Sequence, residues 1–75
     1  MALENILAGM KDGKVAFSYK KKDDELRQAV GTRNAALIAE DGGEAPVEWI
    51  PRGKAIAYYD LNSHGIRSFA SDKLM

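Results

Sequence analysis

Arginine is the residue type whose chemistry in this chain most directly suggests a ligand. Arg27, Arg33 and Arg67 stand in stretches that alternate in polarity, and Tyr59 stands in another such stretch. A guanidinium group carries a planar fork of donors that matches a phosphate or a carboxylate. An outward aromatic ring can stack on a base. Arg27, Arg33, Arg67 and Tyr59 therefore predict a site for nucleic acid or a nucleotide-like anion.

Each of these residues also has a structural interpretation. Arg67 could form an ion pair with Asp60 or Asp72 while its stem packs on the fold. Tyr58 and Tyr59 are neighbours on a strand, so one ring should face inward and the other outward. The outward ring could stack on a base, or it could pack against an aromatic residue of the next strand.

A run of three lysines, Lys20 to Lys22, is followed at once by three acids, Asp23 to Glu25. The lysines could form a basic tip that touches phosphates. They could equally form a solvated turn whose charges offset one another, because the adjoining acids would repel a phosphate backbone.

Trp49, Ile50 and Arg52 form a second candidate site, for a protein partner. Trp and Arg are enriched at the energetic centres of protein interfaces. The alternative is that Trp49 covers an open end of the fold. A stripe of apolar residues near the N-terminus offers the same choice between an exposed recognition helix and a lid over its own core. A protein–protein module, as a homo-oligomer or an inhibitor of a host protein, is therefore the alternative function.

Catalytic, metal and cofactor sites are not expected. His64 is the single histidine, it stands in a polar turn, and the chain has no cysteine. A general base needs a partner and a substrate group within hydrogen-bond reach, and a zinc site needs several ligands. The sequence has no glycine-rich phosphate loop or paired-carboxylate motif. We therefore expect a protein that is not an enzyme.

The charge and the hydropathy of the chain argue against a non-specific nucleic-acid binder and against a membrane-spanning or secreted protein. Eleven basic residues balance eleven acidic ones, whereas a dedicated non-specific nucleic-acid binder gains its affinity from excess positive charge. Four acids, Glu40, Asp41, Glu44 and Glu48, fall in 34–51 without a base. A membrane span requires about 20 apolar residues, and no such run or secretory signal occurs, so a cytoplasmic protein is expected.

Hydrophobic periodicity predicts a single domain over residues 1–75. Leu3, Ile6, Leu7 and Met10 predict a helix over 1–12. A first hairpin over 14–33 follows, in which Val15, Phe17 and Tyr19 share one face. On its return strand we expect Leu26 and Val30 to face inward, Arg27 and Arg33 to face outward, and Gly31 to mark a bulge or bend.

The remaining chain predicts a loop over 34–53 and a second hairpin over 54–74. Residues 34–39 could continue the preceding strand or form one helical turn, and the last four residues could form a turn or a short fifth strand. Twisted hairpins of this size commonly close into a small barrel, because closure removes exposed sheet edges. The expected fold is mostly β, a small antiparallel barrel of four or five strands with an N-terminal helix.

Two ordered segments, "VAFSYKKKDDELRQAVGTRN" and "YYDLNSHGIRSFASDKL", resemble the WYL-like family of Sm-like, SH3-type small β-barrels. They are most similar to a set of short uncharacterised proteins of Bacteroides-type bacteria and their phages. The resemblance covers residues 14–38 and 54–74. The Trp-Tyr-Leu tripeptide of WYL domains is absent from the corresponding positions, Lys54, Ala55 and Ile56.

The resemblance implies a non-enzymatic β-barrel. WYL domains look like sensors attached to DNA-binding regulators, or modules for nucleotides or nucleic acid, and Sm-like barrels bind RNA or protein and often oligomerise. It therefore implies a small binding module, with a regulatory role in a phage as one possible setting.

Overall fold

The computed structural model describes residues 3–50 and 52–74. Residues 1 and 2 of the expected helix, residue 51 of the expected loop and residue 75 lie outside the described residues. The described helices include none that is long and apolar enough to cross a membrane.

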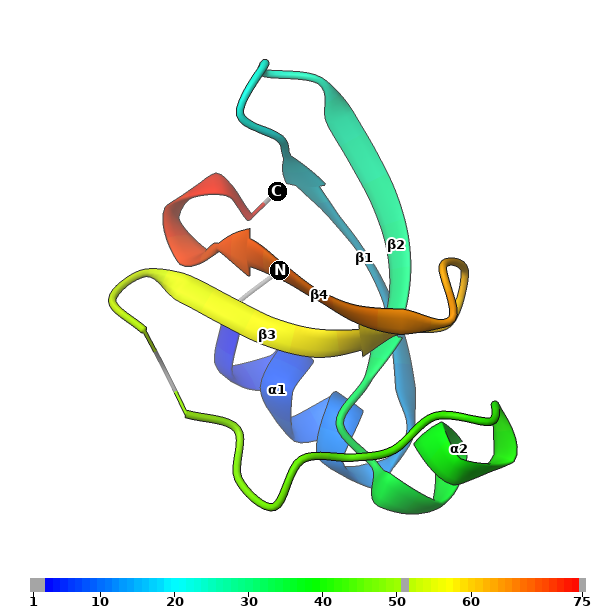
Figure 1. Cartoon of the computed structure of the whole chain (residues 1–75). Coiled ribbons are helices and arrows are strands. Elements are labelled where there is room, and N and C mark those ends of the chain that lie inside the picture. Colours follow the sequence, from blue (N-terminus) through cyan, green and yellow to red (C-terminus); the bar gives the residue numbers. More distant parts are fainter. Residues whose placement is uncertain (1–2, 51, 75) are drawn as a thin grey trace.

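The expected mostly β architecture with an N-terminal helix is confirmed (Figure 1). Helix α1, Leu3–Asp12, precedes a 4-stranded antiparallel sheet of order β1-β2-β3-β4. The strands are β1, Lys14–Lys20; β2, Leu26–Thr32; β3, Ala55–Asp60; and β4, Gly65–Ala70.

Strand β2 holds the two hairpins together at one end only. It pairs with β1 along its whole length, but with β3 only at Gly31 and Thr32. The two ribbons therefore diverge and curl around a common interior (Figure 1). After β4, the short 3₁₀ helix η1, Ser71–Lys73, leads to Leu74, whose backbone bridges back to Tyr19 of β1.

Aromatic rings fill the space between the ribbons. The ring of Phe17 lies 5.1 Å from that of Phe69 and 5.2 Å from that of Tyr58, measured between centroids. Helix α1 adds Ile6 and Met10, both fully buried in the same cluster. The N-terminal apolar stripe is therefore a lid over its own core.

The expected facing of β2 is wrong. Opposite residues of an antiparallel pair share a face, and the register places Arg27 opposite Tyr19 and Ala29 opposite Phe17. Arg27 and Ala29 therefore face inward with these rings. Leu26 faces the other way and is 56% exposed. Phe17 lies opposite the small Ala29, and Arg27, opposite Tyr19, bonds to Asp60. The apolar pattern of β2 did not reveal this arrangement.

Of the two expectations for Gly31, the bulge is wrong, because the residue pairs regularly with Val15 and Asp60. A Cβ at this position would collide with Cδ2 of Tyr58. The glycine is needed because the Tyr58 ring packs directly on the backbone of β2.

The segment 34–53 is not wholly a loop, because it contains helix α2, Ala35–Glu40. The side chain of Asn34 caps this helix by accepting hydrogen bonds from the backbone N–H groups of Ala36, at 3.0 Å, and Leu37, at 3.2 Å. Asn is among the preferred residues at this position. The helical alternative for 34–39 is therefore the correct one.

Candidate functional site

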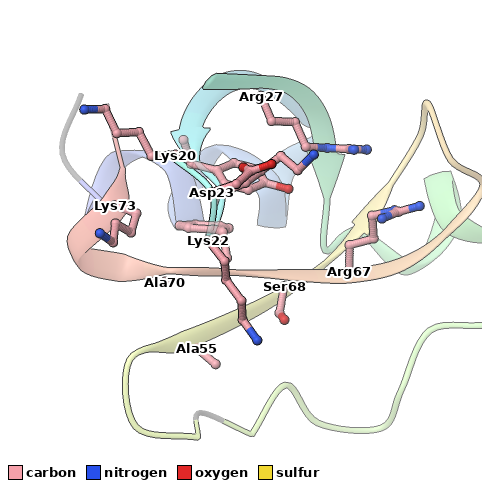
Figure 2. Close-up of a pocket in the computed structure, with 12 residues that line it drawn as sticks. Lys20, Lys22, Asp23, Arg27, Ala55, Arg67, Ser68, Ala70 and Lys73 are labelled. Carbon is pink, nitrogen blue, oxygen red and sulfur yellow. The ribbon is translucent and has the colours of Figure 1, made fainter. Parts of the chain in front are cut away.

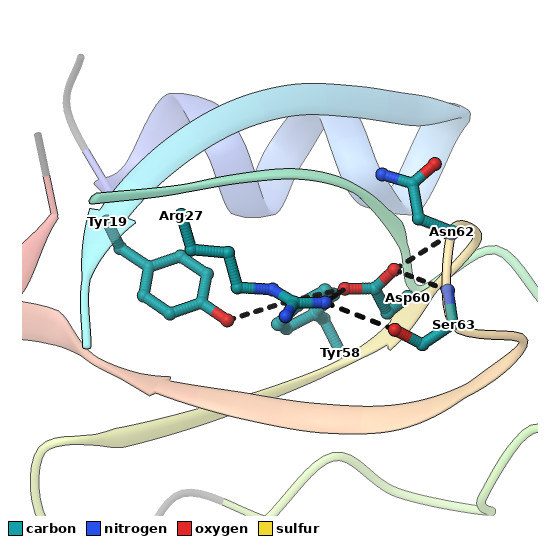
Figure 3. A network of polar contacts seen from close by, with 6 residues as sticks. All are labelled: Tyr19, Arg27, Tyr58, Asp60, Asn62 and Ser63. Carbon is teal, nitrogen blue, oxygen red and sulfur yellow. Dashed lines mark hydrogen bonds and ion pairs between the residues drawn. The ribbon is translucent and has the colours of Figure 1, made fainter. Parts of the chain in front are cut away.

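Asp60 organises the end of β3. One carboxylate oxygen, Oδ1, accepts hydrogen bonds from the backbone N–H groups of Asn62, at 2.8 Å, and Ser63, at 3.0 Å (Figure 3). An Asp that bonds the backbone two residues ahead is a common turn-forming device. Asp60 therefore fixes the turn between β3 and β4.

The other oxygen of Asp60 faces the barrel interior. Oδ2 accepts hydrogen bonds from the Tyr58 hydroxyl at 2.9 Å and from Nη2 of Arg27 at 3.3 Å. Nη2 also donates to the Ser63 hydroxyl at 3.1 Å, and the hydroxyls of Tyr19 and Tyr58 lie 3.4 Å apart. These contacts tie β1, β2, β3 and the turn into one cluster, which we call the Asp60 network (Figure 3).

Both charges of the network are stabilised. Burial acts to raise the pKa of Asp60, but the hydrogen bonds that it accepts, led by that from the Ser63 backbone, outweigh burial and lower the pKa. Burial acts to lower the pKa of Arg27, but the hydrogen bond to Asp60 and nearby charges raise it. Asp60 is therefore a buried carboxylate at neutral pH.

A pocket of about 710 Å³ opens beside this network, between the β1–β2 turn, β4 and η1. Its walls carry many cationic side chains and one acid, Asp23 (Figure 2). The cationic residues are Lys20, Lys21, Lys22, Arg27, Arg67 and Lys73. Arg27 projects from β2 on one side and Arg67 from β4 on the other. We call this hollow the basic pocket.

Ion pairs within the chain engage few of these cations. Lys21 lies 3.6 Å from Glu25, and Arg27 is bound to Asp60. The two acids considered for Arg67 have other partners, since Asp60 pairs with Arg27 and Asp72 pairs with Lys54 at 3.4 Å. Within residues 3–50 and 52–74, Arg67 has no ion-pair partner.

One hydrogen-bond donor of the Arg27 guanidinium is not used within the described part of the chain. Its Nε is buried and has no hydrogen-bond partner among the described residues. The side chain remains 26% exposed at the pocket. Arg27 is therefore anchored by Asp60, but not all of its hydrogen-bond donors have a partner.

Arg33 lies apart from the basic pocket. Its Nε donates to the Ala57 carbonyl at 2.9 Å, and its guanidinium lies 5.1 Å from the ring centroid of Trp49. Burial lowers the pKa of Arg33. Arg33 therefore holds the loop that carries Trp49 against β3.

A second hollow, of about 430 Å³, lies where this loop crosses β3 and β4. Its wall includes Trp49, Ile50 and Arg52, the residues expected at a partner site, together with Ile66. Ile50 is 67% exposed and Ile66 54% exposed. We call this hollow the Trp49 groove.

Tyr59 is not available for stacking, because it is only 3% exposed. Its hydroxyl donates to Asp41 at 2.9 Å, and Nδ1 of His64 lies 2.8 Å from the same carboxylate oxygen. The hydrogen bonds from His64 and Tyr59 lower the pKa of Asp41. Both tyrosines are thus buried. Tyr58 lies in the core, and Asp41 and Gly43 cover Tyr59 on the face of β3 that we expected to meet solvent.

The predicted site residues are therefore divided between two places. Arg27 and Arg67 meet at the basic pocket, and Trp49, Ile50 and Arg52 meet at the Trp49 groove. Arg33 supports the groove, and Tyr59 belongs to the fold.

Sequence reasoning missed several residues that contribute to these sites. Lys73 joins the basic pocket, and Ser63 and Asp60 anchor Arg27. For the lysines at the first turn, the sequence allowed a basic tip, but the acids that follow them indicated that the positive charge would be offset. The structure forms an ion pair only between Lys21 and Glu25 within this run, and places the other lysines at the pocket wall.

Comparison with known proteins identifies the fold family. The sequence matches the WYL_2 family, described as an Sm-like SH3 β-barrel fold, over residues 3–75. No curated protein and no solved structure matches the chain significantly. The match spans nearly the whole chain and agrees with the strands and helix described above, so the chain belongs to the WYL_2 family of Sm-like SH3 β-barrels.

Proposed function

We propose that this protein is a non-enzymatic binding module whose basic pocket holds a phosphate group of a nucleic acid or a nucleotide. Membership of the WYL_2 family supports the coarser statement, a small binding module. The observation that carries the finer proposal is the lining of the pocket, in which six cationic side chains stand against one acid.

The charge is local and does not reflect a basic protein. The chain has a formal net charge of +0, so a cluster of cations around one hollow is a specific arrangement. Like charges held close together repel one another, and a bound anion relieves that repulsion. This supports a pocket whose preferred occupant is negatively charged.

The two arginines suit a phosphate in complementary ways. Arg27 is held in place by Asp60 and Ser63, which lowers the entropy lost when it binds a ligand. Arg67 is exposed and has no ion-pair partner in the described part of the chain. A guanidinium fork binds phosphate oxygens in a bidentate manner, and the lysines of the turn add charge without strict geometry.

The contacts of the acidic groups support binding without catalysis. Both oxygens of Asp60 already accept hydrogen bonds, and the Asp41 carboxylate is engaged by Tyr59 and His64. A general base has to reach a proton of the substrate. These carboxylates instead stabilise the turn and the packing of α2.

The test is binding at low ionic strength, measured by fluorescence anisotropy with labelled single-stranded RNA and DNA and by calorimetry with nucleotides. The affinity should fall steadily with salt, because phosphate neutralisation releases counterions. Arg67→Ala should weaken binding about tenfold, the loss of one charged hydrogen-bond partner. Lys11→Ala, which removes the same charge from α1, is the matched control and should bind almost normally. Failure of RNA, DNA and nucleotides alike to bind at low salt would refute the proposal.

A protein partner at the Trp49 groove is the second candidate. Ile50 and Ile66, which line this groove, are 67% and 54% exposed. The N-terminal stripe no longer contributes, because Ile6 and Met10 are buried in the core. Mass measurement in solution, with Trp49→Ala as the comparison, should show an oligomer that the variant disrupts. A monomer at all concentrations would argue against self-association.

The cellular setting remains a prediction. We propose a cytoplasmic module that acts in regulation, in a phage or its bacterial host. Capture of bound nucleic acid from the native cell, with Arg67→Ala as the control bait, would test that role.

A further inference from the structure

The basic pocket and the Trp49 groove adjoin one another. Ala55, Arg67 and Ser68 line both hollows. Resting on the proposed function, we propose that the two hollows together bind one nucleotide unit. Its phosphate lies in the basic pocket, its base lies in the Trp49 groove, and Arg67 stands at the junction.

The chemistry changes sharply between the two hollows. The basic pocket has six cationic side chains and one acid, whereas the groove has two arginines and one acid beside Trp49, Ile50 and Ile66. An inorganic anion would leave the apolar groove uncovered, and an apolar molecule would leave the cations unpaired. A ligand that joins an anionic group to a flat, weakly polar ring would pair with the cations of the basic pocket and cover the apolar residues of the Trp49 groove.

Trp49 is positioned in advance for a ring. Arg33 lies over it at 5.1 Å and is itself fixed by its hydrogen bond to the Ala57 carbonyl at 2.9 Å. A ring that is already ordered loses little entropy on binding, and stacking on an aromatic side chain favours the binding of a base. Trp49 thus supplies the stacking surface that the buried Tyr59 cannot.

Charge favours this occupant over a second copy of the chain. The groove carries Arg52 and Arg67 against one acid, Glu48. A second copy seated face to face would bring its own Arg52 and Arg67 toward these, and like charges at an interface are costly. A nucleotide instead brings the negative charge that the junction lacks.

The experiment uses the emission of Trp49, the single tryptophan of the chain. The full-length protein is titrated at low salt with adenosine 5′-monophosphate and with ribose 5-phosphate, which lacks the base. The complete nucleotide should bind about tenfold more tightly, because it adds stacking. It should also quench Trp49, whereas ribose 5-phosphate should leave the emission nearly unchanged.

Variants separate the two ends of the ligand. Trp49→Leu should remove the tenfold advantage while leaving the affinity for ribose 5-phosphate unchanged, and Trp49→Phe should keep part of it. Arg67→Ala should weaken both ligands. Calorimetry follows the two Trp49 variants, since they lack the tryptophan signal, and circular dichroism confirms that each of the three variants is folded.

The nucleotide unit could belong to a free nucleotide or to a single strand, and a second pair of ligands distinguishes these sources. A short single-stranded oligonucleotide is compared with an abasic strand of the same length. A base-dependent gain in the strands alone assigns the site to nucleic acid, and a gain in the monomers alone assigns it to free nucleotides. Either result supports the proposal.

Three results would overturn it. Equal binding with and without the base, in both pairs, would leave the proposed function standing as a phosphate site and remove the base site. Concentration-dependent Trp49 emission without ligand, together with a dimer mass, would assign the groove to a second copy. Absence of binding in all four titrations would remove the proposed function and this inference together.

Discussion

The Asp60 network and the basic pocket share Arg27, yet they treat charge in opposite ways. In the network the Asp60 carboxylate is fully buried and accepts hydrogen bonds at both oxygens. In the pocket, cations line an open hollow with a single acid among them. The polar groups of the network bind to one another within the protein, whereas most cations of the pocket remain available to a ligand.

The difference shows which polar residues hold the fold and which can hold a ligand. A buried polar group is costly unless it is hydrogen-bonded, so the loss of a hydrogen-bonded member of the network should destabilise the barrel. Exposed cations are solvated and carry little stability, so the pocket can remain incomplete without cost to folding. Mutations in the two regions should therefore have separable effects.

The largest effect on stability should come from Asp60→Ala. Removal of one member of a buried ion pair typically costs about 3–5 kcal/mol. Because Arg27 is 26% exposed, we expect a loss near the lower end of that range. The variant also loses the bonds that form the turn to β4. Chemical denaturation measures the loss, and Asp72→Ala, at an exposed acid, is the control. A loss below about 1 kcal/mol, the range of exposed pairs, would show that the network is not required for folding.

Gly31→Ala should have the next largest effect, because the network depends on the position of Tyr58. The new methyl group would meet the Tyr58 ring, and overpacking of this kind costs about 1–3 kcal/mol. Gly13→Ala is the matched control, since nothing lies within 4 Å of its Cβ position. Equal stability of the two variants by thermal denaturation would contradict the packing described for Tyr58.

Acid should weaken the network but not the cations of the pocket. The pKa of Asp60 is lowered in the folded state, so its contribution is complete above the unfolded value of about 3.9. That contribution is lost as the pH falls through the folded pKa. Stability measured from pH 6 downward should therefore decline below about pH 4, and Asp60→Asn should decline less steeply. Parallel curves for the two proteins would show that Asp60 is not the group responsible.

Arg67→Ala should have the smallest effect on stability, within about 0.5 kcal/mol, as is usual for surface positions. The comparison becomes sharper with Arg27→Ala, which should lose stability as well as ligand affinity because Arg27 belongs to both regions. Denaturation and binding are measured on the same samples. A large loss of stability in Arg67→Ala would place Arg67 in the fold and not in the pocket.

Much of the fold could be predicted from alternation alone. Val15, Phe17 and Tyr19 repeat at period two, and the structure places β1 at the expected residues. The face of β2 could not be predicted, because Leu26 and Val30 dominate its hydropathy, whereas the inward positions hold Arg27 and the small Ala29. Helix α2 was ambiguous because six residues give too little periodicity, and the cap at Asn34 was the informative signal.

The candidate site was harder to predict because it depends on contacts between distant segments. Arg67 could be chosen from its residue type. That it forms no ion pair with Asp60 or Asp72 could not be predicted, because these acids pair with Arg27 and Lys54 in the folded chain. The burial of Tyr59 depends on its contacts with Asp41 and Gly43, which follow α2 in the sequence. Sequence spacing carries no information on such competition for partners.

The central claim is that the basic pocket is where this protein binds a phosphate-bearing ligand. Backbone amide NMR during titration with a single-stranded oligonucleotide tests it most directly. The account predicts that signals of residues 20–23, 66–70 and 73 move together and saturate, while those of α2 stay in place. Movement centred on α2 and α1, or no movement at low salt, would contradict it.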